Sequence, residues 1–200
     1  MKPLSTLAEA VHASSTMAID TMYKNMKAQG IDVVGFGAGE PDFPTPDNIK
    51  EACIRALAEN KTKYTAASGI IELKKAVCQR MKEDCGLDYQ PSQVLIASGA
   101  KHNVYLAVRA LVNPGDEVVI PGPYWVSYSE IVRMCGGVPV IAHTREADEF
   151  KLTPQELSEA ITDKTKCVLF NSPSNPTGMM YTREELRALA DVCVAHDLYI

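Results

Sequence analysis

The sequence predicts an α/β protein with a mainly parallel sheet that helices cover on both faces. From residue 94 onward, short apolar runs alternate with segments of helical length. Five of these runs are predicted to be strands, at 94–97, 118–120, 138–142, 167–170 and 198–200. Because parallel neighbours need a long crossover, the alternation favours right-handed strand–helix–strand units.

The part of the chain before residue 90 predicts helices and a connecting loop rather than strands. Apolar spacing places three helices there, at 13–29, 46–59 and 69–85. Thr45 is expected to cap the second helix and Pro46 to open it, because a proline in the first turn loses no needed hydrogen bond. Gly30 and Gly86 follow the first and third helices, where a glycine commonly ends a helix.

Four more helices are expected between the predicted strands, at 100–112, 125–135, 154–162 and 183–196. Two of them begin with the sequence pattern of a capping box. Thr153 is followed by Glu156, and Thr182 is followed by Glu185. Because the two side chains of a capping box satisfy each other's backbone N–H groups, these helix starts are well defined by sequence.

Composition and charge narrow the functional classes. Lys and Arg total 20 against 25 Asp and Glu, a net charge of −5, so nucleic acid is not an expected partner. No window approaches the ~18 apolar residues of a membrane helix, and the first residues lack the apolar core of an export signal. A cytoplasmic location without a membrane partner is therefore expected. The six cysteines form no CxxC pair and the histidines have no ligand spacing, so reduced thiols and no metal are expected.

The end of the sequence and its missing motifs give two further expectations. The apolar run 198–200 follows directly on a predicted helix, whereas natural ends usually fall at exposed positions, so a longer protein is expected. The signatures of a Walker phosphate loop, a serine hydrolase elbow and a dinucleotide fingerprint are absent from the sequence.

Candidate binding residues follow the predicted strands, because ligands of open α/β sheets bind beyond the carboxyl ends of the strands. Gly99, Ala100 and Lys101 begin a helix, whose first N–H groups and positive dipole end favour a phosphate. Trp125 could stack on a planar ligand. Asn175 lies in a loop whose course is fixed by two X-Pro steps. From the residues alone, a tight turn, a packed aromatic and a solvated turn remain open at these three places.

Taken together, five segments of the chain resemble the class I (aspartate-aminotransferase-like) pyridoxal-phosphate-dependent aminotransferases of fold type I. The segments are Gly39-Glu40-Pro41-Asp42-Phe43, Lys63-Tyr64-Thr65 with Ser68-Gly69, Gly99-Ala100-Lys101, Pro114-Gly115-Asp116-Glu117-Val118 with Pro123-Tyr124-Trp125, and Asn171-Ser172-Pro173-Ser174-Asn175-Pro176-Thr177-Gly178. They occur in the family's order and spacing over essentially the whole chain. The resemblance implies the large domain of fold type I, incomplete at its C-terminal end, and pyridoxal 5'-phosphate as the cofactor.

The resemblance also implies roles for single residues. Gly99, Ala100 and Lys101 match the helix start that binds the cofactor phosphate. Trp125 matches the aromatic residue that stacks on the pyridine ring. Asn175 matches the asparagine that donates a hydrogen bond to the phenolic oxygen of the ring and so favours its anionic form.

Two further matches concern the partner subunit and the substrate. Tyr64 is similar to the tyrosine that reaches the cofactor phosphate of the neighbouring subunit, so a homodimer with shared active sites is implied. Gly39 is similar to the glycine whose backbone contacts the α-carboxylate of the substrate. The resemblance places four family residues beyond Ile200: the Schiff-base lysine, the pyridine-binding aspartate, a tyrosine near the phenolic oxygen and the carboxylate-binding arginine. No catalytic residue is therefore expected within residues 1–200.

The resemblance implies transfer of an amino group between an amino acid of the aspartate type and a 2-oxo acid such as 2-oxoglutarate. The expected domains are 1–45, an N-terminal arm with part of a small domain, and 46–200, the N-terminal part of the large cofactor-binding domain. Two alternatives remain open. One is a non-catalytic, truncated module that binds pyridoxal phosphate, and the other is a fold type I enzyme of another activity, a C–S lyase or a decarboxylase.

Overall fold

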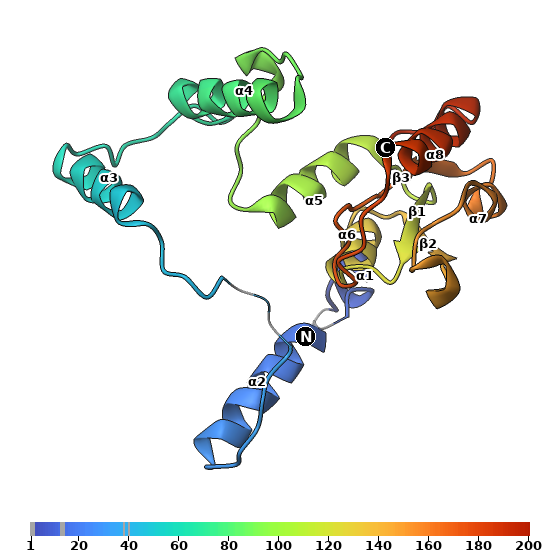
Figure 1. The fold of residues 1–200 in the computed structure, drawn as a ribbon, viewed down its shortest axis with the longest axis horizontal. Coiled ribbons are helices and arrows are strands. Elements are labelled where there is room, and N and C mark those ends of the chain that lie inside the picture. The colour runs from blue at the N-terminus through green and yellow to red at the C-terminus, as the bar shows by residue number, and fades with distance from the viewer. Residues whose placement is uncertain (1–2, 13–14, 38, 40) are drawn as a thin grey trace. The chain divides into compact units, whose positions relative to one another are not determined.

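The computed structural model describes residues 3–12, 15–37, 39 and 41–200, which belong to two compact units. One unit comprises Met1–Gly37 with Val104–Ile200, and the other comprises Ala38–Asn103. The boundary between them falls within helix α5 (Ala100–Leu111). Figure 1 shows the elements of each unit along the chain. The predicted domain division at residue 45 stays a prediction.

The first unit is built on a parallel sheet, which has three strands within the described residues, in the order β2-β1-β3. The strands are β1 (Glu117–Gly122), β2 (Val138–His143) and β3 (Thr165–Val168). Strand β1 pairs along its whole length with β2 and over its first half with β3. Three of the predicted strands are thereby confirmed, although β3 begins and ends two residues earlier than expected.

The predicted strand 94–97 is wrong. These residues follow a short 3-10 helix, η1 (Pro91–Gln93), and belong to the second unit. The Ile96 N–H donates a hydrogen bond to the Ser68 carbonyl at 3.0 Å, and Ser68 is part of a turn rather than a strand. An apolar run becomes a strand only where another strand offers it a ladder of hydrogen bonds, and in this unit the described residues form none.

The predicted strand 198–200 is confirmed in place but not in length. Tyr199 forms a single parallel bridge to Cys167 of β3. Its carbonyl accepts a hydrogen bond from the Val168 N–H at 2.8 Å, and its own N–H donates to the Lys166 carbonyl at 3.3 Å. The end of the chain therefore lies beside β3, on the side away from β1.

Helices cover both faces of this sheet, as the sequence predicts. Besides the C-terminal part of α5, the helices of this unit are α1 (Thr6–Glu9), α2 (Ser15–Ala28), α6 (Ser127–Met134), α7 (Pro154–Ala160) and α8 (Arg183–Ala195), with the 3-10 helix η2 (Glu146–Asp148). Alternate residues of β1 enter two separate apolar clusters, since successive side chains of a strand point to opposite faces. Val118 and Ile120 pack with residues of α5 and α6, and Val119 packs with residues of α7 and α8. All three are fully buried, which stabilises the fold by ~1.5–3 kcal/mol for each side chain.

Both predicted capping boxes are confirmed. The Thr153 hydroxyl accepts the Glu156 N–H at 3.2 Å, and the Glu156 carboxylate accepts the Thr153 N–H at 2.9 Å. The Thr182 hydroxyl likewise accepts the Glu185 N–H at 3.2 Å, and the Glu185 carboxylate accepts the Thr182 N–H at 2.7 Å. These reciprocal bonds fix the starts of α7 and α8.

The second unit contains two helices of more than one turn within its described residues, α3 (Asp47–Ala58) and α4 (Ile71–Cys85), besides the start of α5. Pro46 is the N-cap of α3, one residue later than the predicted cap, because its carbonyl accepts the first helical N–H bonds. Helix α4 ends as predicted on Gly86, whose φ of 69° lies in the left-handed region that glycine favours. None of the described helices is long and apolar enough to cross a membrane.

Close packing joins the start of α4 to the segment before α5. Gly69 has a φ of +98°, and a Cβ there would lie 2.6 Å from the Ile96 side chain. The ammonium of Lys74, which is 9% exposed, donates to the Ser68 hydroxyl at 3.0 Å. Glycine at position 69 is therefore required by both its backbone conformation and its close approach to Ile96.

Candidate functional site

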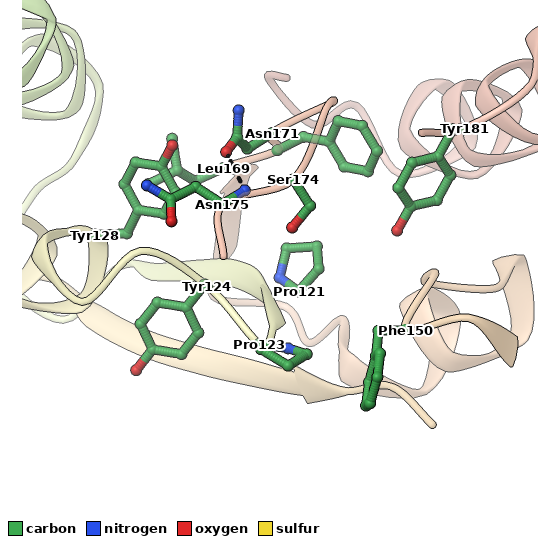
Figure 2. A pocket seen from close by; sticks show the side chains of 11 residues that line it. Pro121, Pro123, Tyr124, Tyr128, Phe150, Leu169, Asn171, Ser174, Asn175 and Tyr181 are labelled. Carbon is green, nitrogen blue, oxygen red and sulfur yellow. Dashed lines mark hydrogen bonds between the residues drawn. The ribbon is translucent and has the colours of Figure 1, made fainter. Parts of the chain in front are cut away.

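A pocket lies where β1 and β3 end in the first unit. It is lined by Pro121, Pro123, Tyr124, Tyr128, Phe150, Leu169, Phe170, Asn171, Ser174, Asn175 and Tyr181. Figure 2 shows these side chains around the pocket, with Asn171, Ser174 and Asn175 on the loop that follows β3 and with Tyr128, Phe150 and Tyr181 on other segments. The pairing of β3 with β1 continues through the Leu169 N–H, which donates to the Val119 carbonyl at 2.9 Å. The pocket thus occupies the carboxyl edge of the sheet, where open α/β folds bind their ligands.

The loop after β3 carries the predicted residue Asn175 into this pocket. The Asn175 N–H donates to the side-chain oxygen of Asn171 at 2.9 Å, a bond drawn in Figure 2. The loop closes on itself further along, because the Gly178 N–H donates to the Ser174 carbonyl at 2.7 Å. Gly178 has a φ of 75°, which the turn needs and which glycine adopts without strain. The backbone of Asn175 is therefore held from both sides.

An aromatic pair forms one side of the site. The rings of Trp125 and Tyr128 meet edge to face, with centroids 5.3 Å apart and planes at 89°. Tyr128 lines the pocket, whereas Trp125 stands next to it and is not part of the lining. Burial raises the pKa of the Tyr128 hydroxyl, so this phenol stays protonated and can donate a hydrogen bond at neutral pH.

The opposite side of the pocket is held by Tyr181. Its hydroxyl accepts the Leu152 N–H at 2.6 Å, and its ring packs against Phe170 with centroids 4.7 Å apart. Burial raises the pKa of Tyr181, and the bond from Leu152 opposes that shift only in part. Tyr128 and Tyr181 are therefore neutral groups near pH 7.

The other predicted site residues lie in the second unit. Helix α5 begins at Ala100, and Gly99 before it has a φ of +83° with no heavy atom within 4 Å of the position of a Cβ. The N–H groups of Ala100 and Lys101 fall in the first turn of this helix. Tyr64 and Gly39 are exposed.

The structure brings Asn175 together with Tyr128, and through Tyr128 with Trp125. Sequence reasoning missed Asn171, Tyr128 and Tyr181 as residues of the pocket. A usable signal existed for two of them. Asn171 precedes Asn175 by four residues in a loop rich in proline, and Tyr128 follows Trp125 by three residues at a helix start. No local pattern marks Tyr181, whose partner Leu152 is 29 residues away.

The fold places the chain among the class I and II aminotransferases. A profile of the family "Aminotransferase class I and II" matches residues 31–200, and the chain belongs to this family. It is 52% identical over 187 residues to an aspartate aminotransferase of Geobacillus stearothermophilus, covering 94% of this chain and 48% of that protein. It is 51% identical over 193 residues to an aspartate/prephenate aminotransferase of Cereibacter sphaeroides, covering 96% of this chain and 48% of that protein.

A solved structure shows the same fold. The aspartate aminotransferase of Thermus thermophilus with maleate superposes with a TM-score of 0.96 at 42% identity, over 100% of this chain and 52% of that one. The chain thus spans about half the length of the relatives that it matches. The α/β fold type I architecture expected from the sequence is confirmed.

Members of this family work with pyridoxal 5'-phosphate, and each unit by itself offers groups that suit one part of that molecule. A phosphate needs N–H donors, which the first turn of α5 supplies. A pyridine ring with a phenolic oxygen needs an aromatic face and a neutral donor, which Trp125 and the carboxamide of Asn175 offer. Within the described residues, no group of three or more His, Cys, Asp or Glu side chains could hold a metal ion.

Proposed function

We propose that the protein is a pyridoxal-phosphate-dependent aminotransferase that moves an amino group between an amino acid of the aspartate type and a 2-oxo acid such as 2-oxoglutarate. The observation that carries this proposal is the presentation of Asn175 into an aromatic pocket at the carboxyl edge of the sheet. Family membership and the names of the relatives support it. Because some relatives are named aspartate/prephenate aminotransferases, prephenate is a second substrate to test.

In this proposal, each binding residue performs one task. The first N–H groups of α5, at Ala100 and Lys101, bind the phosphate, and Gly99 leaves room for it. Trp125 fixes the plane of the ring through stacking. The Asn175 carboxamide donates to the phenolic oxygen and favours its anionic form. The bound cofactor supplies an aldehyde and an electron-withdrawing ring for amino transfer.

Two further residues are proposed to act on the substrate and across a subunit interface. The backbone of Gly39 contacts the substrate α-carboxylate, and Tyr64 reaches the cofactor phosphate of a second copy of the chain. The full exposure of the Tyr64 side chain is compatible with such a partner. We also propose a cytoplasmic homodimer. None of residues 1–200 is assigned the role of the lysine that bonds to the cofactor aldehyde.

The proposal is tested with the full-length protein. It is mixed with pyridoxal phosphate, aspartate and 2-oxoglutarate, and the formation of glutamate and oxaloacetate is measured. Equimolar appearance of both products is expected. Cofactor binding without transfer would instead support the non-catalytic module, and release of sulfide or carbon dioxide from amino acids would support the lyase or decarboxylase.

The shared site has a test of its own. Tyr64→Phe removes a hydroxyl from an exposed side chain, so the fold is expected to be unchanged and the affinity for pyridoxal phosphate to fall by roughly tenfold. Tyr89→Phe, in the same unit and also on an exposed side chain, is the matched control and is expected to bind the cofactor normally. An unchanged affinity in Tyr64→Phe would argue against a site shared between subunits.

A further inference from the structure

The carboxamide of Asn171 ties the end of β3 to the backbone of Asn175. Its oxygen accepts the Asn175 N–H at 2.9 Å, across four residues of a loop that is otherwise exposed on much of its surface. We propose that Asn171 is a positioning residue, which aims the Asn175 side chain at the phenolic oxygen of the cofactor. This inference rests on the proposed function and adds to it a residue that does not itself contact the cofactor.

The tie begins from a fixed point in the sheet. Leu169 is bonded to Val119 of β1 at 2.9 Å, and Asn171 follows it by two residues. Val119 is fully buried in the core. The Asn171 carboxamide therefore lies close to the rigid edge of the sheet. Its hydrogen bond gives Asn175 a defined position relative to that edge.

The other side of Asn175 is restricted by its neighbour in sequence. Pro176 limits the backbone conformations open to the preceding residue, and it cannot donate a hydrogen bond of its own. The bond from Gly178 to Ser174 then fixes the far end of the turn. The bond from the Asn175 N–H to Asn171 then restricts the orientation of the peptide group between Ser174 and Asn175.

The exposure of Asn175 explains why a second residue is needed to position it. Its side chain is exposed rather than wedged in the core, so packing alone does not hold its orientation. The net free energy of one such hydrogen bond changes an equilibrium constant by roughly five- to tenfold. We expect the bond to Asn171 to favour, by that factor, the orientation in which the Asn175 side chain points at the cofactor.

Hydrogen exchange of the full-length protein without cofactor tests the tie itself. Asn171→Leu replaces the carboxamide with an apolar group of similar size, and amides of the segment 171–178 are expected to exchange roughly five- to tenfold faster. Asn171→Asp keeps the accepting oxygen and is expected to retain slow exchange. Ser172→Ala is the matched loop control, because its hydroxyl accepts the Tyr181 N–H at the longer distance of 3.4 Å. Exchange unchanged in Asn171→Leu would overturn the proposal.

A double-mutant cycle on pyridoxal phosphate affinity tests the action through Asn175. Asn171→Leu alone is expected to weaken binding roughly five- to tenfold, and to weaken it no further in an Asn175→Ala background. Equal losses in both backgrounds would overturn the positioning role and leave the proposed function standing. A wild-type protein that binds no pyridoxal phosphate would instead overturn the proposed function, and the positioning role with it.

Discussion

The Tyr181 hydroxyl accepts a 2.6 Å hydrogen bond from the backbone N–H of Leu152, and so joins two segments that lie 29 residues apart in the chain. Leu152 precedes α7 and is 3% exposed, whereas Tyr181 precedes α8 and lines the pocket. A single phenol therefore connects the wall of the pocket to the helices that cover one face of the sheet.

Removal of this phenol is expected to destabilise the protein. Tyr181→Phe keeps the ring against Phe170 but leaves the Leu152 N–H without its acceptor, at a cost of about 1–2 kcal/mol in the free energy of unfolding. Urea unfolding of the full-length protein measures the loss. Tyr89→Phe, on a side chain that is 40% exposed, is expected to change stability by less than about 0.5 kcal/mol. Equal stabilities of the two variants would contradict the prediction.

Glu130 of α6 connects this helix to the N-terminal segment, residues 3–12. Its carboxylate accepts the His12 N–H at 2.8 Å and pairs with Arg133 at 2.6 Å. Partial burial opposes ionisation, but these two contacts outweigh it and hold the pKa of Glu130 below its ordinary value. A carboxyl group with a lowered pKa stabilises the fold above its unfolded-state pKa, and this stability is lost as pH falls through the folded-state value.

We therefore expect Glu130→Gln to loosen residues 3–12 at neutral pH. Hydrogen exchange of that segment, corrected for intrinsic rates, is expected to rise severalfold, because the glutamine oxygen still accepts the His12 N–H and only the contribution of the charge, about 1 kcal/mol, is lost. In the wild type the same loosening is expected only as pH falls below the ordinary glutamate value of about 4.3. Glu83→Gln makes the same charge change on α4, where Glu83 pairs with Arg80 on an exposed face, and is expected to leave the segment protected.

The features that the sequence predicted correctly depend on neighbouring residues. The capping boxes at Thr153 and Thr182 need only a partner three residues away, and Gly86 needs only its own backbone freedom. The strands at 118–120 and 138–142 are apolar and rich in valine and isoleucine, and they pair across a crossover that is a single helix. Local chemistry decides the helix ends, and a short connection favours the pairing of the two strands.

The features that the sequence did not predict depend on distant partners. Residues 94–97 are as apolar as the other runs, yet they bond to Ser68 through Ile96 and meet no strand. Tyr181 lines the pocket and bonds to Leu152, which lies 29 residues away. Within the site, the prolines of the loop predicted a restricted backbone at Asn175. The hydrogen bond from Asn175 to Asn171 is seen only in the structure. A single sequence does not show which distant residues contact each other.

The buried thiol of Cys167 predicts a loss of stability at alkaline pH. Burial in β3 raises the pKa of Cys167 to about 11, with the nearby Asp116 adding to the shift. A raised pKa means that the folded state holds its proton longer than the unfolded state. The protonated Cys167 thiol therefore makes its full contribution to the free energy of unfolding below the unfolded-state pKa of about 8.5. This contribution is lost as pH rises toward 11.

Cys167→Ala tests this alkaline loss. In the wild type, ionisation of Cys167 is expected to lower the free energy of unfolding between pH 9 and 11 by up to about 1.4 kcal/mol per pH unit. The variant has no thiol at this position, so its free energy of unfolding is expected to fall less steeply over the same range. The variant also loses packing, but that loss is the same at every pH. Cys53→Ala, on an exposed thiol, is the control and is expected to keep the wild-type slope. Parallel curves for Cys167→Ala and the wild type would contradict the assignment.

Gly99 gives the most selective test of the phosphate site, because the chain contains a second glycine of nearly the same backbone conformation at a place with no proposed role. Gly99 and Gly86 have φ values of +83° and +69°, and neither has a heavy atom within 4 Å of a Cβ position. An alanine at either position costs about 1–2 kcal/mol of backbone strain. Gly99→Ala also places a methyl group at the start of α5, and is expected to weaken pyridoxal phosphate binding by at least roughly tenfold, while binding of pyridoxal, which has no phosphate, changes little. Gly86→Ala is expected to lower stability without changing either affinity. Equal losses for pyridoxal phosphate and pyridoxal in Gly99→Ala, measured by equilibrium dialysis of the full-length protein, would remove the phosphate from this helix start.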